Sequence, residues 1–305
     1  MTNLIKKNDA KVYYQLLLTF AYKYCMHIID SHQHFWKYIE ADYDWIDDSM
    51  PALKQDFFPN DLKPIYEHNG IDACIAVQAL SSEVETNTLL KLATDHDFIK
   101  GVVGWVDLCN PNVLQRLEYY AQFEKFKGVR MVLQGEEDGF MEQSTFLHGM
   151  NLLAPLNLTY DILIYPKHLF TAYHLAKKFP QQKFIIDHLA KPAIRQHQFD
   201  NWSELMANFH DLPNVYCKIS GMVTEADWKK WQYTDFTPAL DTVTEVFGAD
   251  RLMYGSDWPV CLLAGSYKNV LDIAKTYFGE FSAEQQKKIF YKNAIQFYNL
   301  DVSWI

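Results

Sequence analysis

The sequence predicts an α/β fold, a single (β/α)8 barrel spanning residues 26–305. Two observations lead to this prediction: short apolar runs recur along the chain, and helical patterns lie between them. Most of the runs are continuously apolar rather than alternating, which is typical of parallel strands covered on both faces. Strand–helix alternation repeated eight times within about 250 residues is what the barrel requires.

The expected elements follow one another in chain order. The strands are expected at 27–30, 73–78, 101–106, 128–133, 161–165, 183–187, 215–220 and 251–255. Apolar residues recur at helical spacing over 169–179 and over 270–277. Pro111 opens a further expected helix, where its missing N–H costs little. The long segment 35–60, rich in aromatic residues, is expected to lie over the carboxyl end of the barrel.

A doubly wound open sheet is the competing architecture. It would bind a nucleotide through a glycine-rich turn after the first strand. That turn reads Ser31-His-Gln-His-Phe-Trp36, and the chain contains neither a GxGxxG motif nor a P-loop. The sequence therefore favours the barrel.

Composition limits the classes of function. The chain has 305 residues, of which 49% are hydrophobic, and a net charge of −10. This apolar content excludes a disordered protein, and the acidic balance argues against a nucleic-acid partner, because phosphate binding needs a basic surface. No run of about 18 uncharged apolar residues predicts a membrane span. Five scattered cysteines without zinc spacing indicate reduced thiols in a cytoplasmic protein.

Residues 1–25 are expected to form an N-terminal extension outside the barrel. The segment places Lys6, Lys7 and Lys11 before an apolar run, which faintly imitates a signal peptide, but no small-residue cleavage site follows. Met26 stands directly before the first expected strand. We therefore divide the chain into an extension, 1–25, and a barrel domain, 26–305.

Polar residues stand at the ends of three expected strands. His32 and His34 follow the first strand, His188 follows the sixth and Asp257 follows the eighth. Side chains at i and i+2 of an extended segment point the same way, and the carboxyl ends of barrel strands carry the active site. Each residue alone has a structural explanation, as a surface pair, a core histidine or a turn aspartate. Their shared position favours a convergent site.

The predicted chemistry of this site follows from its residue types. His32, His34 and Asp257 suit zinc or another borderline divalent ion, which would polarise a carbonyl and lower the pKa of its water. Asp257 is the candidate general base, and His188 would orient the water or stabilise the oxyanion. Without a metal, Asp257 stays the candidate base, and Arg130 and Lys191 would polarise the carbonyl.

Further residues near the strand ends are candidates for substrate contact. They are Gln78, Trp105, Arg130, Lys191 and Trp258. Arg130 interrupts an apolar run, so it needs a buried partner or a ligand, and its guanidinium suits a carboxylate or polyhydroxyl substrate. For Trp105 and Trp258 a core position is an equal alternative, and Lys191 could instead serve a helix dipole.

Four segments resemble the amidohydrolase superfamily: Ile29-Asp-Ser-His-Gln-His-Phe-Trp36, Lys127-Gly-Val-Arg130, Asp187-His-Leu-Ala-Lys-Pro192 and Tyr254-Gly-Ser-Asp-Trp-Pro259. Within it, the chain is similar to the sugar-lactonase branch of L-fuconolactonases and L-rhamnono-1,4-lactonases. Tyr43-Asp-Trp-Ile46 is similar to that branch as well, which adds Tyr43 to the candidate substrate contacts. The resemblance runs from about Met26 to the C-terminus.

The resemblance implies a hydrolase that opens a sugar lactone to the hydroxy acid. It implies a metal site at His32, His34 and Asp257, with Asp257 as base, His188 as the sixth-strand histidine and Arg130 as a substrate contact. Binuclear members carry a lysine at the end of the fourth strand, whereas this strand reads Val129-Arg-Met-Val132 and has none. Mononuclear members usually have a fifth-strand histidine, whereas this strand ends at Tyr165 and the nearest histidine is His168. The resemblance therefore implies one divalent cation, zinc or manganese, or a metal-independent reaction.

Two other functions stay open at this point. The same barrel could be a metal-dependent decarboxylase of an unsaturated or aromatic carboxylic acid, or a binding module without catalysis. The segments at Tyr43 and Lys191 favour the lactonase. The expected partner is a small sugar lactone, with no nucleic acid or membrane, and the chain is expected to be a monomer or a homodimer.

Overall fold

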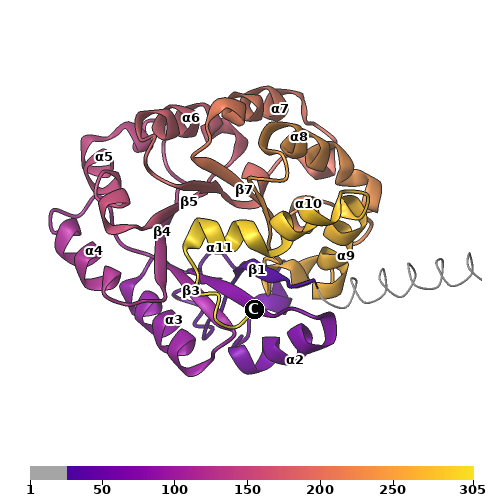
Figure 1. Cartoon of the computed structure of the whole chain (residues 1–305), viewed down its shortest axis with the longest axis horizontal. Helices are drawn as coiled ribbons and strands as arrows, with labels where there is room; N and C mark the ends of the chain where they lie inside the picture. Colours follow the sequence, from indigo (N-terminus) through magenta and orange to yellow (C-terminus); the bar gives the residue numbers. More distant parts are fainter. Residues whose placement is uncertain (1–25) are drawn as a thin grey trace, which may run out of the picture.

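Eight parallel strands, each hydrogen-bonded to the next in chain order, form the centre of the computed structural model (Figure 1). The structure describes residues 26–305, so the predicted extension 1–25 lies outside the described residues. The strands are β1 (Ile29–Gln33), β2 (Ala73–Val77), β3 (Ile99–Gly104), β4 (Phe126–Val132), β5 (Thr159–Leu163), β6 (Phe184–Ile186), β7 (Val215–Ile219) and β8 (Leu252–Tyr254). The predicted (β/α)8 barrel is confirmed.

Helices surround the strands as an outer ring (Figure 1). They are α2 (Pro59–Asn69), α3 (Glu83–Asp95), α4 (Val113–Ala121), α5 (Ser144–Met150), α6 (Leu169–Lys178), α7 (Asp200–Ala207), α8 (Thr237–Phe247), α9 (Tyr267–Phe278), α10 (Ala283–Lys287) and α11 (Asn293–Tyr298). The helical patterns at 169–179 and 270–277 correspond to α6 and α9. Helices α2 to α9 bury apolar residues against the strands, which is why the strands are apolar on both faces, whereas α10 has no buried residue and α11 lies across one end of the barrel.

The barrel closes between β1 and the segment after β8. Asp257 donates its main-chain N–H to the His32 carbonyl at 2.8 Å, and His34 donates to the Trp258 carbonyl at 2.7 Å. The pairing register of β1 shifts between Asp30 and Gln33. β1 continues past its expected end at Asp30, so His32 lies inside the strand.

The two ends of the barrel differ. Helix α11, yellow in Figure 1, crosses the amino-terminal end, where Phe297, Tyr298 and Leu300 pack against Ile29 and Ala73. At the carboxyl end, the segment after β1 forms an aromatic cluster in which the Trp36 ring lies 5.7 Å from Tyr43 and 5.3 Å from Phe57. The cavity that contains the candidate site lies at this carboxyl end.

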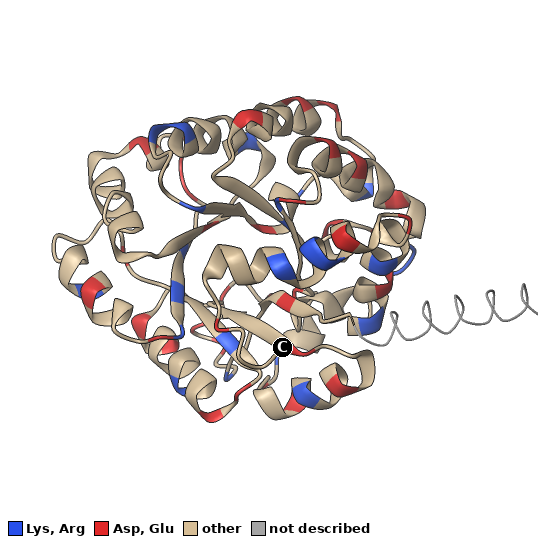
Figure 2. Cartoon of the chain, in the orientation of Figure 1, with Lys and Arg blue, Asp and Glu red and all other residues tan. Residues whose placement is uncertain are grey.

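The surface of the described chain mixes both signs of charge. Figure 2 shows acidic and basic residues interspersed along the outer helices. Within residues 26–305, no helix is long and apolar enough to cross a membrane. The four cysteines of this part of the chain, Cys74, Cys109, Cys217 and Cys261, are free thiols.

Candidate active site

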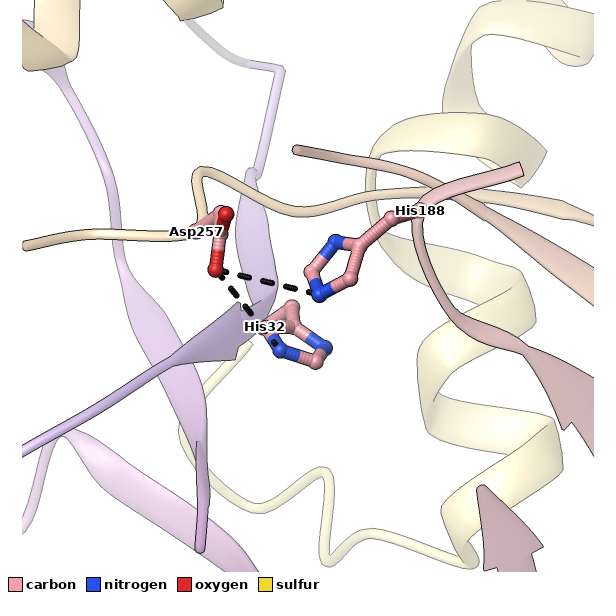
Figure 3. A group of neighbouring side chains, drawn as sticks. All are labelled: His32, His188 and Asp257. Atoms are coloured by element: carbon pink, nitrogen blue, oxygen red, sulfur yellow. Dashed lines mark ion pairs between the residues drawn. The ribbon is translucent and has the colours of Figure 1, made fainter. Parts of the chain in front are cut away.

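Three side chains converge at the carboxyl end of the barrel (Figure 3). His32 lies on β1, His188 follows β6 and Asp257 follows β8, and one donor atom from each lies within 4.8 Å of the others. His32 Nε2 is 3.9 Å and His188 Nε2 is 3.8 Å from Asp257 Oδ1. All three residues are buried. These three residues, which the sequence places near the ends of three strands, therefore lie together in the structure.

His34 approaches the same carboxylate from another side. Its Nε2 lies 3.4 Å from Asp257 Oδ1, and its Nδ1 lies 2.8 Å from the carbonyl oxygen of Val77. A carbonyl only accepts hydrogen bonds, so Nδ1 carries a proton, and Nε2 is the ring nitrogen that faces the Asp257 carboxylate. Nε2 and the carboxylate can share a bridging water.

An unusual turn positions His188. Residues His188 to Lys191 are four consecutive non-glycine residues in the left-handed region, with φ of 52°, 55°, 55° and 53°. Such a conformation costs roughly 1–2 kcal/mol per residue. Trp202 Nε1 donates to the Leu189 carbonyl at 2.8 Å and so helps to hold the turn. Strain of this kind is often found at functional sites.

The floor behind His188 is equally constrained. Its Nδ1 lies 2.9 Å from Ser220 Oγ. Gly221 has a φ of +63°, and a Cβ atom placed there would lie 2.5 Å from His188 Nδ1. Only glycine therefore satisfies both the backbone conformation and the space beside the imidazole.

A buried ionic network lies under His32. Lys218 Nζ donates to Asp161 Oδ2 at 2.5 Å and lies 3.0 Å from Asp187 Oδ1 and 3.0 Å from His32 Nδ1. Tyr298, from the helix that crosses the other end, donates its hydroxyl to the same Asp161 oxygen at 3.0 Å. Lys218, Asp161 and Asp187 are completely buried, so each charge depends on the others.

Arg130 links this network to the cavity. It donates to Asp187 Oδ2 at 3.0 Å and to both the side-chain and main-chain oxygens of Gln78. Its NH1 also lies 3.2 Å from His32 Nε2. Asp187 is thus a buried partner of the kind that we expected for Arg130.

The environment fixes the protonation of the cluster. Burial lowers the pKa of His32 and of His188 well below the ordinary value, so both imidazoles are neutral at neutral pH. Burial opposes ionisation of Asp257, but His188 and His34 outweigh it and lower its pKa. Asp187 behaves in the same way, because Lys218 outweighs burial and holds its pKa well below the usual range. Two neutral imidazoles therefore face an ionised carboxylate.

The cluster opens into a cavity of about 640 Å³. Five of the predicted site residues line it, namely His34, Arg130, Lys191, His188 and Asp257. The segment expected to lie over this end contributes Ala41, Asp42, Asp44, Trp45 and Met50. The volume is within the range of small-ligand sites.

The other predicted substrate contacts lie elsewhere. Tyr43, Gln78, Trp105 and Trp258 are not among the described residues that line this cavity. Tyr43 donates its hydroxyl to Glu85 at 3.2 Å, the Trp105 main chain is bonded to Thr86, and the Trp258 ring packs 5.2 Å from Phe57. The Gln78 side-chain oxygen accepts a hydrogen bond from Arg130. Their contact with a substrate stays a prediction.

The fifth strand contributes no histidine to the cluster. His168, the nearest histidine to β5, accepts at Nδ1 from the Tyr165 N–H and points Nε2 at the Glu136 carbonyl, 3.3 Å away in each case. The interior position of β5 is held by Asp161 and its bond to Lys218. Sequence reasoning missed Asp161 as part of the site's support, although a charge inside an apolar run was a usable signal.

The donor set of the cluster fits one borderline divalent ion. Neutral imidazoles and an ionised carboxylate are the ligand types of catalytic zinc. His32, His188 and Asp257 would hold such an ion, and the contact of His32 Nδ1 with Asp187 Oδ1 at 3.3 Å would orient the imidazole.

Comparisons with known proteins point to one family. The amidohydrolase family model matches residues 29–300. The chain is 37% identical over 260 residues to an L-fucono-1,5-lactonase of Burkholderia multivorans, covering 82% of this chain and 88% of the relative. It is 32% identical over 292 residues to an L-fucono-1,5-lactonase of Burkholderia ambifaria, covering 90% and 96%. A crystal structure of a Burkholderia multivorans amidohydrolase with bound zinc superposes with a TM-score of 0.87 at 36% identity, covering 90% of this chain and 99% of that one.

Proposed function

This chain belongs to the amidohydrolase family as a lactonase-like hydrolase, and from that premise we propose that it opens a small, uncharged sugar lactone to the hydroxy acid. The observation that carries the proposal is the Asp257 carboxylate, which faces the Nε2 atoms of His34 and His188 in the cavity. Relatives that are L-fucono-1,5-lactonases support the substrate class.

The charges of the cavity support an uncharged substrate. Four carboxylates line it, those of Asp42, Asp44, Glu225 and Asp257, against the two cations of Arg130 and Lys191. Both cations already have partners, because Arg130 binds Asp187 and Lys191 binds Glu225. An anionic acid would meet an excess of negative charge, which disfavours the decarboxylase alternative. The same excess would favour release of the anionic product.

In the first step that we propose, Asp257 acts as general base. A water between Asp257 and His34 loses a proton to the carboxylate while its oxygen attacks the lactone carbonyl carbon. Because the pKa of Asp257 is lowered, the carboxylate is ionised throughout the neutral range. His34 Nε2 lies 3.4 Å from the same carboxylate and would help to position the water beside it.

In the second step, the ring C–O bond breaks. The oxyanion formed in the first step collapses to the carbonyl of the acid. Without a metal ion, His188, whose Nδ1 contacts Ser220 Oγ, would stabilise that oxyanion by donating its Nε2–H. Asp257 then returns its proton to the departing ring oxygen, which becomes a hydroxyl group. The carboxylic acid formed ionises in water, so one proton is released per turnover.

A divalent ion held by His32, His188 and Asp257 would polarise the lactone carbonyl and lower the pKa of the water. Zinc is our first choice of ion and manganese the second, and the relative crystallised with zinc supports the choice. Whether the ion is required is decided by chelation. Turnover that survives a chelator would leave carbonyl polarisation to His188 and the cationic side chains. Turnover lost on chelation and restored by zinc or manganese would make the ion essential.

Acid release at constant pH tests the proposal. The panel contains L-fucono- and L-rhamnono-lactones, 2-pyrone-4,6-dicarboxylate as a charged lactone, and aromatic acids assayed for carbon dioxide. We expect turnover of the uncharged sugar lactones and no carbon dioxide. Preference for the dicarboxylate or release of carbon dioxide would overturn the proposal. Action as a monomer or homodimer in the cytoplasm stays a prediction.

A further inference from the structure

The wall of the cavity carries an ion pair whose carboxylate the proposed steps do not use. Lys191 Nζ donates to Glu225 Oε1 at 2.8 Å, and the two side chains are 19% and 22% exposed. Both residues line the cavity.

Each partner keeps bonding capacity to spare. Within residues 26–305, Lys191 Nζ is the one hydrogen-bond donor to the Glu225 carboxylate, and Glu225 is the one acceptor of that ammonium group. Glu225 Oε2 therefore keeps its lone pairs, and Lys191 keeps two N–H groups. A neighbouring carboxylate acceptor and ammonium donor can bind a hydroxyl group that donates to the first or accepts from the second.

The ion pair is fixed relative to the reacting groups. Lys191 ends the left-handed turn that begins at His188. Glu225 ends a short 3₁₀ helix, Val223–Glu225, whose Thr224 hydroxyl donates to the Gly221 carbonyl at 2.7 Å. The short backbone connections to His188 and Gly221 therefore hold Lys191 and Glu225 in a fixed position relative to His188.

An apolar surface lies beside this polar pair. Trp228 lines the cavity, and its indole N–H donates to the Thr224 carbonyl at 2.8 Å, so its polar atom is satisfied within the protein. The wall thus combines a charged acceptor with a hydrocarbon ring face. A sugar ring has the matching pattern, with hydroxyl groups at its edge and C–H groups on its faces.

We propose that Glu225, held in place by Lys191, is a specificity-determining residue that accepts a hydrogen bond from a ring hydroxyl of the substrate. This inference rests on the proposed lactonase function. Hydrogen bonds to charged groups are the strong ones. A lactone without that hydroxyl leaves Glu225 Oε2 without a hydrogen-bond donor, and a loss of roughly 10- to 100-fold in kcat/KM is the expected size of the effect.

The test compares two substrates and three proteins. The substrates are an aldonolactone that the wild-type chain opens and γ-butyrolactone, which has no ring hydroxyl. The proteins are the wild type, Glu225→Gln and the control Glu83→Gln. Glu83 pairs with Arg116 outside the cavity, and its side chain is 29% exposed, so the control breaks a comparable ion pair away from the substrate.

We expect Glu225→Gln to lower kcat/KM for the aldonolactone by roughly 10- to 100-fold and to change that for γ-butyrolactone by less than about 3-fold. Glu83→Gln should leave the ratio between the substrates unchanged. Equal losses of kcat/KM on both substrates would show that Glu225 has a merely structural role. No loss on either substrate would show that it has no role. Either outcome would overturn the inference. A wild-type chain that opens no lactone would instead overturn the proposed function, and with it this inference, before any variant is compared.

Discussion

The main-chain N–H of Asp257 donates to the carbonyl oxygen of His32 at 2.8 Å, so the proposed base and a candidate metal ligand are joined where the barrel closes. Asp30 strengthens the same seam, because its Oδ1 accepts from the Ser256 N–H at 2.8 Å and its Oδ2 accepts from the Tyr66 hydroxyl at 2.9 Å. The site therefore depends on backbone geometry as well as on its side chains, and several consequences can be measured.

Replacing Gly221 by alanine should damage the site more than the fold. The new Cβ would lie 2.5 Å from His188 Nδ1 and would push the imidazole from its place. We expect kcat/KM to fall by at least about 10-fold, since small displacements of reacting groups can cost about 100-fold. Gly70→Ala is the matched control, because Gly70 has a φ of +70° but open space around its Cβ position. Both variants should lose roughly 1–2 kcal/mol of unfolding free energy. Equal activity in the two variants would contradict the assignment of His188.

Lys218→Met should destabilise the barrel strongly. It leaves Asp161 and Asp187 without the ammonium group that both contact, and breaking a buried ion pair costs about 3–5 kcal/mol. Lys268→Met is the control, because the Lys268–Asp272 pair on α9 is exposed and should contribute less than about 1 kcal/mol. Urea unfolding measures both. The double variant Lys218→Met with Asp161→Asn should recover part of the loss, and no recovery would argue against the pairing.

Glu85 should give the stability a pH dependence that can be isolated. Burial raises its pKa from 4.5 to about 7, although the Leu80 and Ala79 N–H groups oppose the shift. Between those two pH values the folded state binds more protons than the unfolded state, so this contribution to stability falls as pH rises. The lowered pKa values of His32 and His188 act in the opposite direction, because stability is lost as pH falls below their ordinary value of 6.5.

The Glu85→Gln variant separates these contributions. Unfolding free energies of wild type and variant, measured from about pH 5 to about pH 8, should show the variant gaining relative stability as pH rises toward 7. A difference between the two proteins that stays constant across this range would contradict the raised pKa.

Zinc should stabilise the folded chain. An ion held by His32, His188 and Asp257 binds only the folded state, and at about 100 times its Kd it would add about 2.7 kcal/mol. We expect zinc to raise the unfolding temperature of the wild type and of the control His210→Ala, whose imidazole is exposed. The rise should disappear in Asp257→Asn. An equal rise in Asp257→Asn would place the bound ion elsewhere.

The strands and most of the candidate site residues could be predicted from the sequence, for identifiable physical reasons. The continuously apolar runs indicated the strands because parallel strands are covered on both faces. The site residues His32, His34, His188 and Asp257 were recognisable because barrel sites gather at one end of the strands. The interior placement of Arg130 followed from a charge within an apolar run.

Other features depend on contacts that the sequence does not encode locally. Asp161 and Lys218 are 57 positions apart, and only the closed barrel brings them together. The left-handed turn from His188 to Lys191 contains no glycine or asparagine to signal it, and tertiary packing through Trp202 holds it instead. Glu225 lies in a short helix after β7 whose position relative to Lys191 becomes visible only in the fold.

The most direct test of the central claim is the rate of lactone hydrolysis by Asp257→Asn. The substitution preserves shape but removes the proton acceptor, so we expect kcat to fall by about 100- to 10,000-fold. Near-ultraviolet circular dichroism and the unfolding transition of the metal-free proteins should show that the fold is retained. A properly folded Asp257→Asn variant that hydrolyses the lactone within a few-fold of the wild-type rate would contradict the assignment of Asp257 as the base.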